Sequence, residues 1–162
     1  MNDDTLILTS RSEDETEAIG RTLMGLLPEG AVVALRGELG AGKTCLVRGM
    51  AAAIAPDAAV SSPTFTMVNE YEGTPKIYHL DLFRIAEPRE IMDLGYEDLF
   101  DAPEGICVVE WAERAEKLLP SKRLDITLEH AGKTTRTLHL QNHSLLPQQW
   151  QSSIQNRPNP KT

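Results

Sequence analysis

The sequence predicts an α/β fold, a three-layer sandwich with a central, mostly parallel sheet and a C-terminal β-hairpin. Three observations favour this class. Short apolar runs alternate with segments of helical periodicity. A glycine-rich stretch, GELGAGKT (37–44), separates one such run from the next helix, and two alternating segments near the C-terminus flank an Ala-Gly turn. We expect one domain over residues 1–142, followed by a weakly ordered tail over 143–162 that is rich in Gln, Asn, Pro and Ser.

The first elements are a strand and a helix. Residues 5–9 (TLILT) form a short β-prone run. Ser12 and Glu15 then have the spacing of a capping box, and acidic residues fill the first turn, where the helix dipole favours them. Apolar residues recur at helical spacing as far as Leu27, and Pro28 predicts the end of the helix.

The middle of the chain alternates strand and helix. Residues 31–35 (AVVAL) are apolar throughout, which is typical of a parallel strand buried on both faces. The glycine-rich stretch follows, and residues 44–54 predict the helix behind it. Residues 66–71 and 76–82 predict two strands joined through the turn EGTP.

The C-terminal half adds another strand and the hairpin. Residues 87–100 predict an interrupted helix with Pro88 at its first position. Residues 105–111 (GICVVEW) predict a second buried strand, which a short helix follows. The hairpin consists of the alternating segments 123–130 and 133–141.

Charge and composition exclude several classes. The net charge is −8, with 24 acidic and 16 basic residues, and no Lys/Arg cluster occurs, so we expect no strong direct binding of RNA or DNA. No apolar run approaches the length that crosses a membrane, and the acidic N-terminus does not resemble a secretory signal. Cys45 and Cys107 lack C-x-x-C spacing, as expected for reduced thiols in a cytoplasmic protein.

The glycine-rich stretch matches the phosphate-binding pattern G-x-x-x-x-G-K-[ST]. Glycines let successive backbone N–H groups converge on phosphate oxygens, beside the positive end of the helix dipole. Lys43 can reach the β- and γ-phosphates, and the Thr44 hydroxyl can bind Mg²⁺. We therefore expect a nucleotide with Mg²⁺ as ligands, and the absence of the guanine-binding N-K-x-D segment favours ATP or ADP over GTP. The expected binding residues of the loop are Glu38, Leu39, Gly40, Ala41, Gly42, Lys43, Thr44 and Cys45.

Two acidic residues are candidates for the chemistry of hydrolysis, which needs acids at the ends of buried strands. Asp81 closes KIYHLD, and Glu110 closes GICVVE. Each of them could also be an ordinary exposed acid at a strand end. His79 and His139 lack the spacing of metal ligands, which favours structural roles for both.

Arg136 is a less obvious candidate. It shares strand parity with Leu138 and Leu140, so it points to the apolar side of the hairpin. A buried guanidinium needs a partner. A nucleotide, an acid such as Glu129, or a snorkelling arrangement with the charge in solvent would each serve.

Missing motifs narrow the class of nucleotide-binding protein. The D-x-x-G and N-K-x-D segments of a GTPase do not occur, and neither does the L-S-G-G-Q-like signature of a transport ATPase. A stand-alone small-molecule kinase remains as an alternative. Such a kinase needs an arginine-rich lid, and the acidic segment 87–100 does not fit that role.

Five motifs together resemble one family. The segments GELGAGKT (37–44), SSPTF (61–65), YHLDLFR (78–84), LGYEDLF (94–100) and VEWAER (109–114) occur in the order and spacing of the TsaE family. Its members are small bacterial P-loop ATPases that take part in forming threonylcarbamoyladenosine on tRNA. The resemblance covers about residues 12 to 140.

The resemblance implies roles for particular residues. Thr64 would lie in a switch-like loop near the γ-phosphate. Asp81 would be the acid important for hydrolysis, and Glu110 would lie at the magnesium ion with Thr44. Lys43, Asp81, Glu110 and Thr64 are thus the expected catalytic set.

The resemblance also implies further nucleotide contacts. Trp111 would lie beside the nucleotide pocket, although the sequence alone favours core packing for this residue. Ser12 or Glu13, with Arg136, would approach the nucleoside end. Phe83 stands where the family more often has tyrosine, so no role is assigned to a hydroxyl there.

The partners that the resemblance implies are the proteins TsaB and TsaD. The ATP-bound protein would dock on this pair, and hydrolysis would reset the assembly. We expect slow hydrolysis without partners, because no arginine is obviously placed to stabilise the transition state in cis; Arg84 and Arg114 are the conceivable exceptions.

Overall fold

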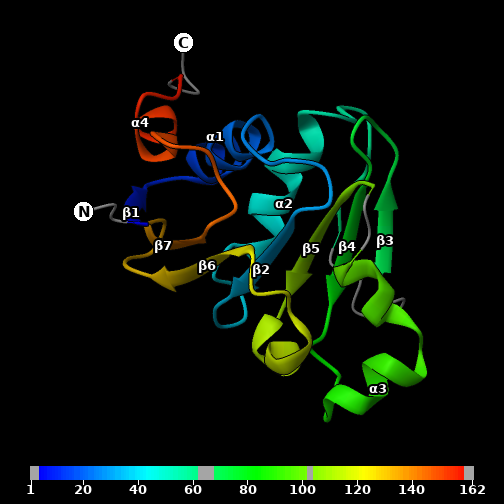
Figure 1. Cartoon of the computed structure of the whole chain (residues 1–162). Coiled ribbons are helices and arrows are strands. Elements are labelled where there is room, and N and C mark those ends of the chain that lie inside the picture. Colours follow the sequence, from blue (N-terminus) through cyan, green and yellow to red (C-terminus); the bar gives the residue numbers. More distant parts are fainter. Residues whose placement is uncertain (1–3, 62–67, 102–103, 159–162) are drawn as a thin grey trace.

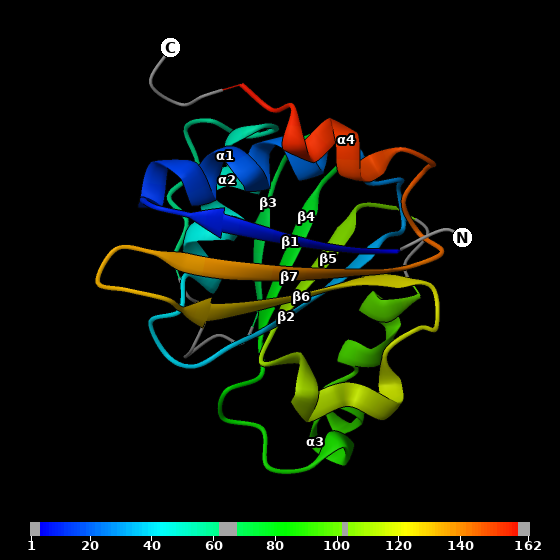
Figure 2. The same cartoon turned by 90° about the vertical axis from the view of Figure 1, so that its left-hand side faces the viewer.

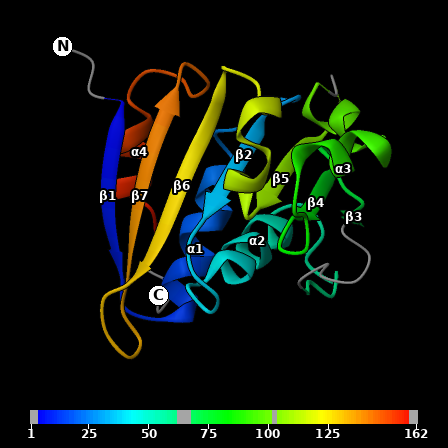
Figure 3. The same cartoon turned by 90° about the horizontal axis from the view of Figure 1, so that it is seen from below.

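A seven-stranded sheet forms the centre of the computed structural model, which describes residues 4–61, 68–101 and 104–158 (Figure 1). The strand order is β1-β7-β6-β2-β5-β4-β3. Figure 3 shows this order across the sheet. The strands are β1 (Thr5–Ser10), β2 (Val32–Arg36), β3 (Val68–Tyr71), β4 (Ile77–Asp81), β5 (Ile106–Glu110), β6 (Arg123–His130) and β7 (Arg136–His143).

The four middle strands, β6, β2, β5 and β4, are parallel to one another. Antiparallel partners close both edges: β3 pairs with β4, β7 with β6 and β1 with β7. The burial of β2 and β5 explains their apolar sequences, because helices cover both faces of a parallel sheet. The predicted α/β fold with a mostly parallel centre and a C-terminal hairpin is confirmed.

Helices cover both faces of the sheet, and each face has a hydrophobic core of its own (Figures 1 and 2). On one face lie α1, α2 and α4, and on the other lie α3 and the 3-10 helices η1 and η2. No helix in the described part of the chain is long and apolar enough to cross a membrane. The helices are α1 (Glu13–Met24), α2 (Lys43–Ala52), α3 (Pro88–Asp93), η1 (Tyr96–Phe100), η2 (Ala112–Leu118) and α4 (Trp150–Gln155).

Helix α1 begins as the capping signal predicts but ends earlier. The Ser12 hydroxyl accepts a hydrogen bond from the Glu15 N–H over 3.1 Å. The Glu15 carboxylate accepts a hydrogen bond from the Arg11 N–H over 2.8 Å. In a capping box the usual donor is the N–H of the N-cap residue, which here is Ser12. The helix ends at Met24, where Gly25 takes the C-cap position, rather than continuing to Leu27.

Two glycines let α1 and α2 pack with their backbones in contact. A Cβ atom on Gly20 would lie 2.3 Å from the Leu46 carbonyl oxygen, and one on Gly49 would lie 2.0 Å from that of Glu17. Both distances are shorter than real Cβ atoms reach, so only glycine fits. The close packing sets the start of α1 beside the start of α2.

The segment after His143 differs from the predicted weakly ordered tail. Leu146, Trp150 and Ile154 recur every four residues, and their exposed fractions are 8%, 2% and 0%. These three side chains join the core beneath α1 and β7, and α4 lies beside α1 (Figure 2). The polar composition of the segment hid a narrow apolar stripe, which is enough to hold a short helix.

We predict that Ile154→Ala lowers the free energy of unfolding by about 2–5 kcal/mol, because it leaves a cavity in a fully buried site. Ser152→Ala, on the exposed side of the same helix, is the matched control and should change it by no more than about 0.5 kcal/mol. Denaturant unfolding measures both values. Equal, negligible effects of the two substitutions would show that α4 does not contribute to the fold.

Candidate nucleotide-binding site

Parallel pairing brings the functional ends of three strands to one edge of the sheet. In the register of the strands, Glu110 at the end of β5 lies between Leu35 of β2 and Asp81 at the end of β4. The loop 37–44 leaves β2 at this edge. The two predicted acids therefore lie beside the predicted phosphate loop.

The loop adopts a conformation that only glycine supports easily. Gly37, Gly40 and Gly42 have φ values of 143°, 80° and 108°. A Cβ atom on Gly37 would also lie 2.5 Å from the Leu128 carbonyl oxygen of β6. Gly42 is the N-cap of α2, which starts at Lys43. The loop therefore ends at a helix N-terminus, where anions bind favourably.

Lys43 is buried at the centre of the site, with an exposed fraction of 5%. Its ammonium donates hydrogen bonds to the carbonyl oxygens of Gly37 and, over 3.2 Å, of Glu38. The ammonium also lies 4.1 Å from the centre of the Trp111 ring. Burial lowers the pKa of Lys43, and the nearby carboxylate of Glu110 opposes this shift. The ammonium is thus held by two loop carbonyl groups and by the face of Trp111.

Two side chains contact the carboxylate of Glu110. Its Oε2 atom lies 3.0 Å from the Thr44 hydroxyl, which donates to it, and 2.5 Å from Nε2 of His79. Only 3% of Glu110 is exposed, and within residues 4–61, 68–101 and 104–158 no other hydrogen bond or ion pair of its carboxylate is found. Both contacts use Oε2, and no contact of Oε1 is found among the described residues.

Asp81 occupies a separate position at the same edge. It is 4% exposed, and its Oδ1 accepts a hydrogen bond from the Phe83 N–H over 2.9 Å. This contact closes a tight turn after β4 and fixes the carboxyl group. Asp81 and Glu110 are thus buried and specifically placed, which rules out the alternative of ordinary exposed acids.

One cavity of about 380 Å³ is lined by residues 39–44 of the loop and by both acids. It is lined by Glu13, Leu39, Gly40, Ala41, Gly42, Lys43, Thr44, Cys45, Arg48, Asp81, Phe83, Glu110 and Trp111. Leu39 is 77% exposed at the tip of the loop, whereas Ala41 is buried. Glu38 lines a different hollow, beside β6. Burial raises the pKa of the Cys45 thiol to about 11, which keeps it protonated at neutral pH.

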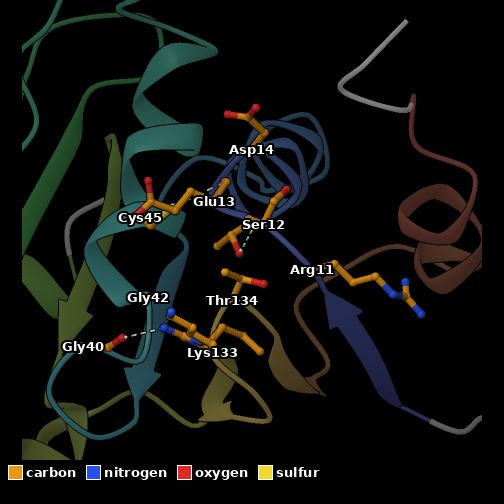
Figure 4. A pocket seen from close by; sticks show the side chains of 11 residues that line it. Arg11, Ser12, Glu13, Asp14, Gly40, Gly42, Cys45, Lys133 and Thr134 are labelled. Atoms are coloured by element: carbon orange, nitrogen blue, oxygen red, sulfur yellow. Dashed lines mark hydrogen bonds between the residues drawn. The ribbon is translucent and has the colours of Figure 1, made fainter.

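A second cavity of about 480 Å³ adjoins the first, because Glu13, Gly40, Gly42 and Cys45 line both. Figure 4 shows Ser12 and Glu13 at the start of α1 facing Gly40 and Gly42 of the loop, with Lys133 and Thr134 of the β6–β7 turn below them. The helix and the hairpin turn thus form its two walls. Ser12, Glu13 and Arg136 all line this cavity, and their contact with the nucleoside end stays a prediction.

Five residues of this cavity were not predicted. They are Arg11, Asp14, Thr16, Lys133 and Thr134. The side chain of Arg11 points away from the loop, whereas Lys133 and Thr134 lie close to it (Figure 4). The turn of the predicted hairpin could have indicated Lys133 and Thr134, but only the pairing of β6 with β2 brings that turn to the loop.

Arg136 joins the hairpin to the phosphate loop. Its guanidinium donates to the carbonyl oxygens of Thr135 over 3.0 Å, Gly132 over 3.2 Å and Gly40 over 3.4 Å. Three backbone carbonyl groups therefore accept hydrogen bonds from the partly buried guanidinium. The acid considered as a partner, Glu129, lies 3.6 Å from His139 instead.

Trp111 lies at the mouth of the site in a left-handed backbone conformation, with φ of 57°. Its ring packs 5.1 Å from that of Phe83, centre to centre. It also contacts Lys43 and lines the cavity, so core packing alone does not describe it. Arg114 donates a hydrogen bond to the Ile85 carbonyl oxygen over 2.8 Å and so anchors the chain beyond β4. Thr64 lies outside the described residues.

A family model described as "Threonylcarbamoyl adenosine biosynthesis protein TsaE" matches residues 10–138. The chain belongs to the TsaE family. The match includes every residue predicted for the site and ends before α4.

Individual TsaE proteins are similar over most of their length. The chain is 39% identical to the tRNA threonylcarbamoyladenosine biosynthesis protein TsaE of Bacillus subtilis (strain 168) over 126 residues, which cover 77% of this chain and 78% of that protein. It is 42% identical to that of Haemophilus influenzae over 110 residues, which cover 67% and 69%. A solved structure titled "Crystal structure of Bacillus subtilus YdiB" superimposes with a TM-score of 0.71 at 29% identity, covering 93% of this chain and 92% of that one.

We predict that nucleotide binding changes the fluorescence of Trp111. Phosphate oxygens that draw the Lys43 ammonium away would alter the charge 4.1 Å from the indole ring. Titration with ATP, followed by tryptophan emission, measures the change. Trp150 in α4 is the second tryptophan, so the Trp111→Phe protein serves as the control. An equal response from that variant would assign the signal to Trp150 and contradict the prediction.

Proposed function

We propose that this TsaE-family protein is a Mg²⁺-dependent ATPase that acts as a nucleotide-gated switch in the formation of threonylcarbamoyladenosine on tRNA. One observation carries the proposal: a single cavity contains the loop residues Lys43 and Thr44 together with the buried acids Asp81 and Glu110. These are the parts that P-loop ATPases combine. The pathway follows from the names of the family and its relatives.

The residues present fit a magnesium ion. The Thr44 hydroxyl lies against the Glu110 carboxylate, whose Oε1 is buried without another partner among the described residues. No group of three or more His, Cys, Asp or Glu side chains that could hold a metal occurs in the described part of the chain. Mg²⁺ commonly takes only one or two protein ligands and completes its shell with phosphate and water oxygens. Thr44 and Glu110 would hold the ion, which neutralises phosphate charge when bound.

Asp81 is the group that we assign to hydrolysis. It lies on the strand next to that of Glu110, lines the same cavity and is held by the Phe83 N–H; in this proposal its carboxylate contacts a water molecule. Such a contact would orient the attacking water. Arg114 is engaged with the Ile85 carbonyl oxygen. This engagement supports slow turnover in the isolated protein.

Partner proteins provide the contact with tRNA in this proposal. An acidic chain with a net charge of −8 is unsuited to bind RNA phosphates directly. The ATP-bound form would dock on TsaB and TsaD in the cytoplasm, and hydrolysis would release it. Binding that depends on nucleotide state requires different contacts in the two states, and the Lys43 ammonium, which would exchange carbonyl for phosphate partners, supplies one such difference.

We predict that Lys43→Ala abolishes triphosphate binding and, with it, complex formation with purified TsaB and TsaD. The substitution removes the ammonium that meets the phosphates. Calorimetry with ATP measures the first effect, and gel filtration of the mixed proteins with Mg-ATP, Mg-ADP or no nucleotide measures the second. Circular dichroism of the variant tests that the fold is kept.

The outcomes separate the candidate functions. Complex formation by the wild type in Mg-ATP only supports the switch. Tight ATP binding without any complex would contradict it, and transfer of the γ-phosphate to a metabolite would then identify a kinase. Unchanged ATP affinity of Lys43→Ala would remove the role assigned to the loop.

We predict that Asp81→Asn slows ATP hydrolysis by about 10²-fold or more, the usual contribution of a positioned acid or base. The amide oxygen can still accept from the Phe83 N–H, so the turn after β4 and nucleotide binding should be retained. Phosphate release, measured with TsaB and TsaD present, gives the rate. Hydrolysis at the wild-type rate would exclude Asp81 from the chemical step.

A further inference from the structure

A row of buried polar contacts connects β3 with the phosphate loop. The Tyr71 hydroxyl lies 3.1 Å from Nδ1 of His79, and Nε2 of His79 lies 2.5 Å from Oε2 of Glu110. The Thr44 hydroxyl donates to the same Oε2 over 3.0 Å. These contacts therefore link side chains of β3, β4, β5 and α2 one after another.

His79 lies where an apolar side chain would be expected. It is fully buried in β4, on the same face as Ile77, and its register partner in β5 is Val108. Burial of a polar ring costs free energy unless its nitrogen atoms are hydrogen-bonded. Both ring nitrogens of His79 have such a partner, and one of them is the buried carboxylate of the candidate magnesium site.

Hydrogen-bond chemistry sets the direction of the shorter contact. The magnesium assignment requires an ionised Glu110, which only accepts, so in this proposal Nε2–H of His79 donates the hydrogen bond to it. The Tyr71 hydroxyl at Nδ1, with its ring centre 5.9 Å from that of the imidazole, holds the ring in this orientation. Rotation of the Glu110 carboxylate would break the contacts with both His79 and Thr44.

We infer that His79 is a positioning residue for the metal and phosphate site, with Tyr71 as its support. His79 contacts Oε2 of Glu110, and in this proposal the carboxylate held in this way binds the ion. The inference rests on the proposed function, because it takes Glu110 as the carboxylate that holds Mg²⁺. Groups that orient a metal ligand commonly change metal affinity by about 10–100-fold when they are removed.

The chain offers a matched pair of substitutions. His79→Gln keeps an N–H donor at about the reach of Nε2, whereas His79→Asn places its donor at the reach of Nδ1 and loses the contact with Glu110. Tyr71→Phe keeps the ring and removes only the hydroxyl. Calorimetry with a non-hydrolysable ATP analogue, in excess Mg²⁺ and in EDTA, gives two affinities for each protein, and a thermal melt gives its stability.

We expect His79→Asn to reduce the ratio of the Mg²⁺ affinity to the EDTA affinity by about tenfold or more, with the EDTA affinity unchanged. His79→Gln should restore most of the ratio, and Tyr71→Phe should reduce it less than His79→Asn does. A structural role alone would lower the melting temperature and weaken both affinities alike, or leave the ratio intact. Either of these results would overturn the inference.

Measurements on the wild-type protein distinguish a failure of the positioning role of His79 from a failure of the magnesium assignment. If Mg²⁺ strengthens its binding and His79→Asn responds equally, only the positioning role fails. If Mg²⁺ has no effect on the wild type, the magnesium assignment of the proposed function fails, and the role of His79 fails with it. Should His79→Asn not fold, an unchanged ratio in Tyr71→Phe overturns the inference and a reduced ratio supports it.

Discussion

Burial of ionisable side chains at one edge of the sheet is the constraint on which the site depends. Lys43, Asp81 and Glu110 are each at most 5% exposed, and an unpaired charge in such a place is costly by several kcal/mol. The parallel pairing of β4, β5 and β2 brings an ammonium and two carboxyl groups together, so that each lies in the field of the other. The loop also stabilises the buried charge of Lys43, because the carbonyl groups of Gly37 and Glu38 accept hydrogen bonds from its ammonium.

Contacts between elements far apart in the sequence form the second cavity, which adjoins the loop at this edge of the sheet. The glycine contact of α1 with α2 sets Glu13 beside Cys45, whose thiol lies 3.5 Å from the Glu13 carbonyl oxygen. On the other side, Arg136 holds the hairpin turn to Gly40 of the loop. The second cavity therefore continues from the phosphate loop between α1 and the hairpin (Figure 4). The proposed nucleotide would place its phosphates at the loop and its nucleoside in this second cavity.

The sequence predicted what depends on local chemistry. The loop motif, the acids at the strand ends and the strand parity of Arg136 follow from spacing alone. The partners of His79 do not, because its contact with Glu110 requires the register of β4 with β5, and that with Tyr71 requires the pairing of β3 with β4. The same holds for Lys133 and Thr134. The helix α4 was missed for another reason: its apolar residues, four apart, are few among Gln and Ser.

The contacts of Lys43 explain how a bound nucleotide could affect residues that it does not touch. Without a ligand, the ammonium is satisfied by two loop carbonyl groups and by the face of Trp111. In the proposed cycle, phosphate oxygens replace these partners, and the Trp111 ring loses its cation. Trp111 packs on Phe83, the residue whose N–H fixes Asp81, so a shift at the mouth of the site also bears on the acid assigned to hydrolysis. Lys43 would thus contact the loop carbonyl groups and Trp111 in one state and phosphate oxygens in the other. ATP and ADP would favour these two states to different degrees, because they offer Lys43 different phosphate oxygens.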